Sequence, residues 1–259
     1  MINKKFIVSN WKNHPDSLAE ALEIMNSVDE YLGSLEEKDF SLVFCPPFVF
    51  IEPAGKILNT SHLLHQSELG AQDISADDST TLTGEVPGPM LRKLGVRYVI
   101  VGHSERRWKL GESDEIVNKK LKAAIRNELI PIVCIGERTR DEKFKDFIKE
   151  QTLNTFSGLS ADEVARCIVA YEPVWAISTT PDARPDTPEL ALESISVIKE
   201  VLNVEYGVFN TYLYGGSINS SNARDFLKED NINGVLVGGA SINKDEFAKV
   251  LSITAELNR

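Results

Sequence analysis

The chain has 259 residues and a net charge of −11 at pH 7, with 42% hydrophobic and 26% charged residues. These values are typical of a folded globular protein and argue against a disordered chain or a coiled coil. The acidic balance argues against nucleic acid or an anionic membrane as the main partner, because both require clustered Lys and Arg. A small anionic substrate is compatible with it, since a few local cations and helix N-termini are enough to bind one.

The three cysteines, Cys45, Cys134 and Cys167, each lie inside a short apolar run. An odd number of cysteines in such settings predicts reduced, buried thiols. No apolar stretch approaches the ~18 residues of a membrane span, and the first residues lead into a run too short for a secretory leader. We therefore expect a cytoplasmic protein.

Short apolar runs recur along the chain at intervals of about 33 residues, which is the length of a βαβ repeat. Continuous apolar runs, as opposed to alternating ones, are typical of parallel strands buried on both faces. The third run is the weakest of the set. The predicted strands cover residues 6–8, 42–45, 69–71, 98–101, 130–134, 167–171, 211–214 and 235–237.

Helical patterns fill the gaps between these runs. They cover residues 17–31, 115–127, 190–202, 220–227 and 244–251. Thr187 followed by Pro188 predicts an N-cap with proline in the first helical turn. Eight strand–helix units without a linker predict one α/β domain over residues 1–259, a closed (β/α)₈ barrel. The alternative, a doubly wound open sheet, normally carries a Gly-x-Gly-x-x-Gly turn after the first strand, and residues 9–12 do not match it.

In a barrel the reactive side chains belong to the loops at the C-terminal ends of the strands. Asn10 and Lys12 follow the first strand, where the lysine either holds an anion or is simply solvated. His103 follows the fourth strand inside a polar cluster and is either an acid–base group or a capping histidine. No histidine or cysteine pair has zinc-ligand spacing, so we expect no metal site.

Glu172 ends the sixth strand and is followed by Pro173 and Trp175. A glutamate there is partly desolvated, which makes it a stronger base, although a rim carboxylate paired with a cation is the alternative. The polar stretch over residues 178–186 is long for a βα connection and is a candidate lid.

Paired glycines follow the last two strands, before Ser217 and at Gly238 and Gly239. Glycine lets backbone amides approach a ligand closely, and barrels commonly bind phosphate at these two loops. The combination of a phosphate cradle, a base, a histidine and a lysine, without a metal or redox motif, predicts proton transfer on a small sugar phosphate with no cofactor.

The chain resembles the triosephosphate isomerase family over its whole length. The matching motifs are Asn10-Trp11-Lys12, Gly102-His103-Ser104-Glu105-Arg106-Arg107, Cys134-Ile135-Gly136-Glu137, Ala170-Tyr171-Glu172-Pro173-Val174-Trp175-Ala176-Ile177, Tyr214-Gly215-Gly216-Ser217 and Leu236-Val237-Gly238-Gly239-Ala240-Ser241. They occur in the family's order and at close to its spacing.

The resemblance implies an aldose–ketose isomerase of glycolysis and gluconeogenesis. By that resemblance, Glu172 abstracts the proton beside the carbonyl of dihydroxyacetone phosphate or glyceraldehyde 3-phosphate, and His103 polarises the carbonyl as a neutral imidazole. Lys12 supplies positive charge near the phosphate and the enediolate, with Asn10 nearby. Glu105 corresponds to a family glutamate that neighbours the lysine.

The same resemblance implies that the amides of Ser178, Ser217, Gly238 and Gly239 hold the phosphate, that of Ser178 when the lid closes. The implied lid and base-covering residues are Pro173, Trp175, Ile177 and Leu236. The implied dimer loop is Thr83-Gly84-Glu85, whose tip inserts into a neighbouring subunit, so a homodimer is expected.

The lid departs from the family pattern. Ser178 and Thr180 replace usual glycines, Pro181 replaces a common lysine, and the lid is about three residues longer than usual. Glycine conformations are strained for other residues, so we expect a lid that closes through a different tip geometry.

Three rival functions stay open from the sequence. One is isomerisation of another small phosphorylated ketose, such as a tetrulose phosphate, by the same residues. Another is a non-catalytic phosphate-binding barrel, against which Lys12, His103 and Glu172 argue. The third is a synthase or lyase barrel, which explains the glycine loops but not the motif around Glu172.

Overall fold

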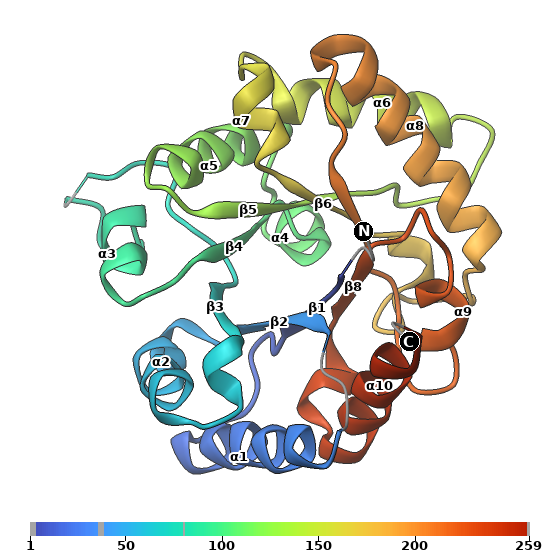
Figure 1. Cartoon of the computed structure of the whole chain (residues 1–259). Coiled ribbons are helices and arrows are strands. Elements are labelled where there is room, and N and C mark those ends of the chain that lie inside the picture. Colours follow the sequence, from blue (N-terminus) through green and yellow to red (C-terminus); the bar gives the residue numbers. More distant parts are fainter. Residues whose placement is uncertain (1–3, 36–38, 80, 258–259) are drawn as a thin grey trace.

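The computed structural model describes residues 4–35, 39–79 and 81–257. Within them, eight parallel strands close into a barrel in chain order, from β1 next to β2 round to β8 next to β1 (Figure 1). The predicted closed barrel is therefore confirmed. The strands are β1 (Lys5–Asn10), β2 (Phe40–Cys45), β3 (Glu68–Ala71), β4 (Tyr98–Val101), β5 (Ile130–Ile135), β6 (Ile168–Tyr171), β7 (Thr211–Tyr214) and β8 (Gly234–Val237).

Helices surround the barrel (Figure 1). They are α1 (Leu18–Ser34), α2 (Ile51–Thr60), α3 (Gly88–Lys93), α4 (Ser104–Lys109), α5 (Asp114–Arg126), α6 (Phe144–Phe156), α7 (Ala161–Ala165), α8 (Pro188–Tyr206), α9 (Ala223–Leu227) and α10 (Lys244–Leu257). The predicted cap of α8 is confirmed, because the Thr187 side chain accepts a hydrogen bond from the Leu190 amide and Pro188 is the first helical residue. No helix in the described ranges is long and apolar enough to cross a membrane.

The core has two parts, which follow from the two faces of each strand. On β1, Ile7 faces the helices and Val8 faces the barrel interior, and both are fully buried. The interior part includes Ile100, Ile132 and Leu213, so the barrel is filled by side chains and is not a pore. This two-sided burial is why the strands have continuous apolar sequences.

The three cysteines are free and buried, as predicted. Burial raises the pKa of the Cys167 thiol to about 12 and raises that of Cys45 further. The thiols therefore stay protonated and act as small apolar side chains.

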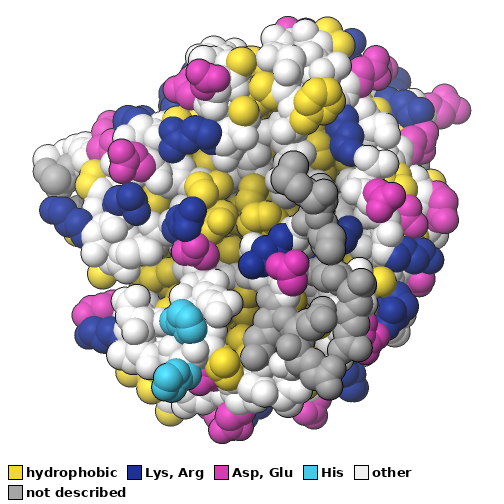
Figure 2. Space-filling view, in the orientation of Figure 1, with side chains coloured by type: hydrophobic (Ala, Val, Ile, Leu, Met, Phe, Trp, Pro, Cys, Tyr) yellow, Lys and Arg dark blue, Asp and Glu magenta, His cyan; other side chains and the backbone are white. Residues whose placement is uncertain are grey.

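Figure 2 shows the end of the barrel at which the strands begin. Apolar side chains occupy its centre, and acidic and basic side chains alternate around it. The loops that carry the candidate site leave the opposite end.

The closure of the barrel between β8 and β1 depends on a missing side chain. A Cβ atom at Gly234 would lie 2.0 Å from the Phe6 carbonyl oxygen, which is backbone and cannot move aside. We expect Gly234→Ala to cost at least ~3 kcal/mol of unfolding free energy and to lower Tm by roughly 6–12 °C.

Gly33→Ala is the matched control for this prediction. A Cβ at Gly33, in α1, would meet the flexible Leu63 side chain at 3.3 Å, and alanine is the better helix former. Differential scanning calorimetry of both variants checks the expectation. Equal melting temperatures for Gly234→Ala and the parent would show that the strands separate without cost at this point.

Candidate active site

The site residues that the sequence analysis places on the strand-end loops gather around one cavity of about 510 Å³ at the C-terminal end of the barrel, the main cavity. Its lining includes Asn10, Lys12, His103, Glu172, Ile177, Ser178, Ser217, Leu236, Gly238 and Gly239. A second cavity of about 430 Å³, the side cavity, shares Asn10, Lys12 and His103 with the first and extends to Gln72 and Leu110.

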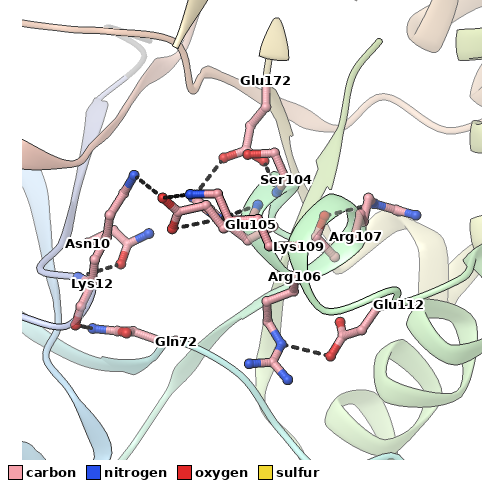
Figure 3. A network of polar contacts seen from close by, with 12 residues as sticks. Asn10, Lys12, Gln72, Ser104, Glu105, Arg106, Arg107, Lys109, Glu112 and Glu172 are labelled. Carbon is pink, nitrogen blue, oxygen red and sulfur yellow. Dashed lines mark hydrogen bonds and ion pairs between the residues drawn. The ribbon is translucent and has the colours of Figure 1, made fainter. Parts of the chain in front are cut away.

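Glu172 follows β6 directly and is only 2% exposed. Its Oε2 atom accepts a hydrogen bond of 2.7 Å from the Ser104 amide, at the start of α4, and Figure 3 shows the two groups facing each other. Its Oε1 atom lies 3.0 Å from the Nε2 atom of His103. A Cβ at Gly215 would approach the Glu172 side chain to 2.9 Å, so glycine there leaves room for the carboxylate. Glu172 is therefore a carboxylate that is shielded from water and lies beside the imidazole ring of His103.

His103 is the N-cap residue of α4. Its Nδ1 atom accepts a hydrogen bond of 3.3 Å from the Glu105 amide. Because Nδ1 is the acceptor, the ring proton of a neutral imidazole is assigned to Nε2, which points at Glu172. A neutral imidazole in this tautomer donates a hydrogen bond into the main cavity.

Lys12 has a left-handed backbone, with φ of 54°, a conformation that is costly for a residue with a side chain. Two contacts hold it. The Asn10 side-chain oxygen accepts from the Lys12 amide at 3.1 Å, and Gln72 donates to the Lys12 carbonyl at 2.7 Å. With its backbone held in this conformation, Lys12 extends its side chain across the cavity, where the Cε atom passes Gly238.

The ammonium group of Lys12 forms an ion pair with Glu105. Lys12 Nζ lies 2.9 Å from Glu105 Oε1, and Figure 3 shows these two side chains pointing toward each other. Burial acts to raise the pKa of Glu105, but the hydrogen bond and charge of Lys12, with His103 and Lys109, outweigh it and hold that pKa below the usual range. The carboxylate is thus ionised and keeps the ammonium group in place beside the cavity.

The predicted phosphate cradle is at the far wall of the main cavity. Ser217 comes from the loop after β7, and Gly238 and Gly239 come from the loop after β8, where a 3₁₀ helix (Gly239–Ile242) begins. Backbone amides at such a helix start favour an anion. The Ser178 amide donates to the Ser217 hydroxyl at 2.8 Å, so the lid rests on this loop.

The predicted base-covering residues lie at and near the main cavity. Ile177 and Leu236 are buried apolar side chains that line the main cavity together with Glu172. Pro173 precedes a 3₁₀ turn, and the Trp175 indole donates to Glu137 at 2.9 Å.

The left-handed residue of the lid is Asp182. Its φ is 58°, whereas Ser178 and Thr180 do not have positive φ. Aspartate tolerates this conformation better than serine or threonine. The lid therefore places its left-handed turn at a residue that accommodates it.

Four contributors were missed or undervalued from sequence. Gln72 and the Ser104 amide position Lys12 and Glu172, and Glu137 fastens Trp175. His14 is exposed and lines both cavities. Ser104 and Glu137 lie inside matched motifs, whereas Gln72 and His14 carried no signal. Among the described residues, no cluster of three His, Cys, Asp or Glu side chains could hold a metal ion.

The predicted dimer loop lies apart from this cavity. Thr83, Gly84 and Glu85 are exposed in the segment between β3 and α3, which projects from the barrel in Figure 1. Gly84 is left-handed, with φ of 87°, so the tip is a tight turn that favours glycine.

A (β/α)₈ barrel with a buried carboxylate, a histidine and a lysine beside a glycine-lined cavity defines an acid–base enzyme for a small anionic substrate. Comparison with known proteins specifies it further. The family model described as triosephosphate isomerase matches residues 5–254. The chain belongs to the triosephosphate isomerase family.

Relatives and a solved structure agree with this assignment. The triosephosphate isomerase of Alkaliphilus oremlandii is 37% identical over 255 residues, covering 97% of this chain and 100% of the relative. That of Moorella thermoacetica is 38% identical over 257 residues, covering 97% and 99%. The crystal structure of triosephosphate isomerase from Bartonella henselae superposes with a TM-score of 0.81 at 30% identity, covering 96% of this chain and 98% of that one. The resemblance stated from the motifs is confirmed.

Proposed function

We propose that the protein interconverts dihydroxyacetone phosphate and glyceraldehyde 3-phosphate through an enediolate, a step of glycolysis and gluconeogenesis. The observation that carries the proposal is the placement of Glu172 Oε1 3.0 Å from His103 Nε2 in a cavity that also contains Lys12. A base, a hydrogen-bond donor and a positive charge thus converge where one small substrate binds.

In the forward direction, the Glu172 carboxylate takes a proton from the carbon beside the substrate carbonyl. The electron pair of that C–H bond forms the enediolate double bond, and negative charge develops on the carbonyl oxygen. His103 Nε2–H donates a hydrogen bond to this oxygen, and Lys12 stabilises its charge. The hydroxyl proton on the neighbouring carbon passes to the former carbonyl oxygen, with His103 Nε2 as the proposed acid and base, and the protonated Glu172 returns its proton to the former carbonyl carbon. The neighbouring carbon thereby becomes the new carbonyl, and the isomerisation is complete without a net change in charge.

The phosphate end is proposed to bind the amides of Ser217, Gly238 and Gly239, and that of Ser178 when substrate is present. The Ser178 amide already points into the cavity wall, where it donates to Ser217. A phosphate oxygen would replace the serine hydroxyl as its acceptor after a small movement. Ile177 and Leu236 keep water from Glu172, which protects the enediolate.

A coupled assay on purified protein, with each triose phosphate as substrate and a chelator present, tests the proposal directly. We expect full turnover in chelator, since every proposed step uses side chains and amides of this chain. A tetrulose phosphate is assayed in parallel. Higher catalytic efficiency on the tetrulose would reassign the substrate, and no turnover of either would favour a non-catalytic phosphate-binding barrel.

The exposed surface also supports a proposal for the oligomeric state. Large apolar side chains are exposed on the loops and helices that follow β2, β3 and β4: Val49, Leu82, Met90 and Leu110. The side cavity opens among these loops beside Lys12, and the Thr83-Gly84-Glu85 tip has the projecting shape to enter such a cavity on another copy. A homodimer would cover the apolar surface and shield the site from solvent.

We also propose a single domain over residues 1–259. We further propose a cytoplasmic location, which the reduced, buried cysteines support.

Light scattering at micromolar concentration should give about twice the monomer mass of 28.8 kDa. Leu82→Glu, at an exposed position beside the tip, should shift the protein toward monomer and lower its activity at nanomolar concentration. Val204→Glu is the control, because Val204 is exposed on α8, far in the chain from these loops. A fully active monomer would show that the Thr83-Gly84-Glu85 loop of one copy is not needed at the active site of another.

A further inference from the structure

We infer that Asp186 is a positioning residue for the lid: its carboxyl group, when protonated, holds the lid in the docked conformation, and its ionisation releases the lid. Docked here means the arrangement in which the Ser178 amide donates to Ser217. The inference deepens the proposed function, since the lid covers the proposed substrate site. It concerns the end of the lid opposite to Ser178.

Asp186 is the last lid residue before the Thr187 cap of α8. Its Oδ1 atom accepts a hydrogen bond of 2.8 Å from the Thr187 amide, so its backbone and carboxyl group are fixed by the helix start. Its Oδ2 atom is buried and has no hydrogen-bond partner of normal geometry among the described residues. An ionised oxygen in that position has lost water, and burial costs more than the few neighbouring donors return.

The group that faces this carboxyl is the Tyr214 hydroxyl. Tyr214 is 1% exposed, and its ring stacks on Phe226 with centroids 3.9 Å apart. A Cβ at Gly216 would lie 2.1 Å from the Tyr214 hydroxyl, so the hydroxyl lies directly under the loop that carries Ser217. Both ends of the lid therefore rest on one rigid unit, Ser178 on Ser217 and Asp186 on Tyr214.

The charged groups near Asp186 do not neutralise it. Arg140 is already paired, at 3.1 Å with Glu137 and at 2.6 Å with Glu193. Glu137 itself adds negative charge. Arg184, in the lid, has its guanidinium carbon 5.2 Å from the centre of the Trp175 ring.

Burial therefore dominates and raises the pKa of Asp186 to about 6. The Thr187 amide, Tyr214 and Arg140 act in the opposite direction, and Glu137 adds to the increase. When the lid lifts, the carboxyl group meets water and its pKa returns toward the ordinary value of 3.8.

The direction of the pH effect follows from linkage. The docked lid has the higher pKa, so it binds the proton more tightly than the lifted lid. The contribution of this proton to docking is fully present below pH 3.8, is lost as the pH rises from 3.8 to about 6, and does not change further above it. The pKa of the carboxyl group differs by ~2 units between the docked and the lifted lid. The equilibrium constant for docking can therefore change with pH by at most a factor on the order of a hundred.

Asp186→Asn tests the inference, because an amide has the shape of the protonated acid and cannot ionise. The readout is the Kd of 2-phosphoglycolate by calorimetry between pH 5 and 8, expressed as the ratio of parent to variant so that the ionisation of the ligand cancels. We expect a ratio that is already above one at pH 5, rises severalfold or more up to about pH 7 and then levels off. Asp182→Asn, the same change at an exposed lid position, should give a flat ratio. A flat ratio for Asp186→Asn would overturn the inference.

A measurement without substitution keeps the two proposals distinguishable. The Asp186 carboxyl carbon is followed by NMR in labelled parent protein, and its apparent pKa is expected near 6. Tyr214→Phe removes a group that lowers this value and should raise it. A carboxyl that titrates near 4 in the parent would refute the role of Asp186 even if isomerase activity is found, whereas absent activity with a titration near 6 would refute only the function.

Discussion

Glu172→Asp should lower kcat by at least about a hundredfold while the protein folds normally. In the parent, one carboxylate oxygen accepts a hydrogen bond of 2.7 Å from the Ser104 amide, and the other lies 3.0 Å from His103 Nε2. Shortening the side chain by one methylene withdraws the carboxylate by more than ~1 Å from the substrate carbon, and such a misplacement is enough for this loss.

The loss should fall on kcat and not on KM. The groups proposed to bind the phosphate, at Ser217 and Gly238, belong to other strands and do not depend on the length of the Glu172 side chain. A change confined to kcat identifies an interaction made in the transition state. Steady-state kinetics with circular dichroism as the fold check measure this.

Glu189→Asp is the matched control, because Glu189 lies exposed in the first turn of α8. It should keep the parent kinetics. If Glu172→Asp retained more than half of the parent kcat, Glu172 would not be the base, and the carboxylate at this position would be a rim group as the sequence alone also allowed.

The fold was predictable because burial on both faces leaves a direct mark in sequence. Residues 98–101 are an uninterrupted apolar run, and β4 covers the same four residues, all buried. The N-cap and proline before α8 act through local backbone chemistry, so they too could be identified locally. The closed sheet then followed from the repetition of the strand–helix unit.

The contacts that give the site its geometry were less accessible. Gln72 holds the Lys12 carbonyl from sixty positions away, and nothing about an isolated glutamine announces such a contact. The left-handed conformation of Lys12 is also invisible in sequence, because lysine rarely adopts it and one of the two contacts that hold it comes from the distant Gln72. In the lid, the departures from glycine suggested a changed turn, but the left-handed position at Asp182 could not be located from the sequence, because it depends on the path of the chain.

Lys12→Met should reduce kcat/KM by on the order of a thousandfold or more, since removing one group that stabilises transition-state charge typically costs 10²–10³ in kcat and the phosphate also loses its cation. Methionine keeps an unbranched stem that can pass Gly238, so the lost charge is the main change. The strained backbone is held by Asn10 and Gln72 through main-chain atoms, and these contacts persist in the variant.

Lys109→Met is the matched control for this prediction. Lys109 Nζ lies 3.7 Å from the same Glu105 oxygen atom that binds Lys12, but its side chain is 65% exposed. Removing it deprives Glu105 of a neighbouring charge without removing a group from the main cavity, so we expect less than a threefold change in kcat/KM.

The separate effects of Lys12→Met on kcat and on KM then show what the ammonium group does. A rise in KM with unchanged kcat would mean that Lys12 only attracts the phosphate. A fall in kcat together with a rise in KM would mean that its charge also stabilises the developing enediolate, as we expect of a lysine that lines the same cavity as His103 and Glu172. Parent-like kinetics for Lys12→Met would show that the first loop does not reach the substrate, and the left-handed strain at Lys12 would then have no catalytic purpose.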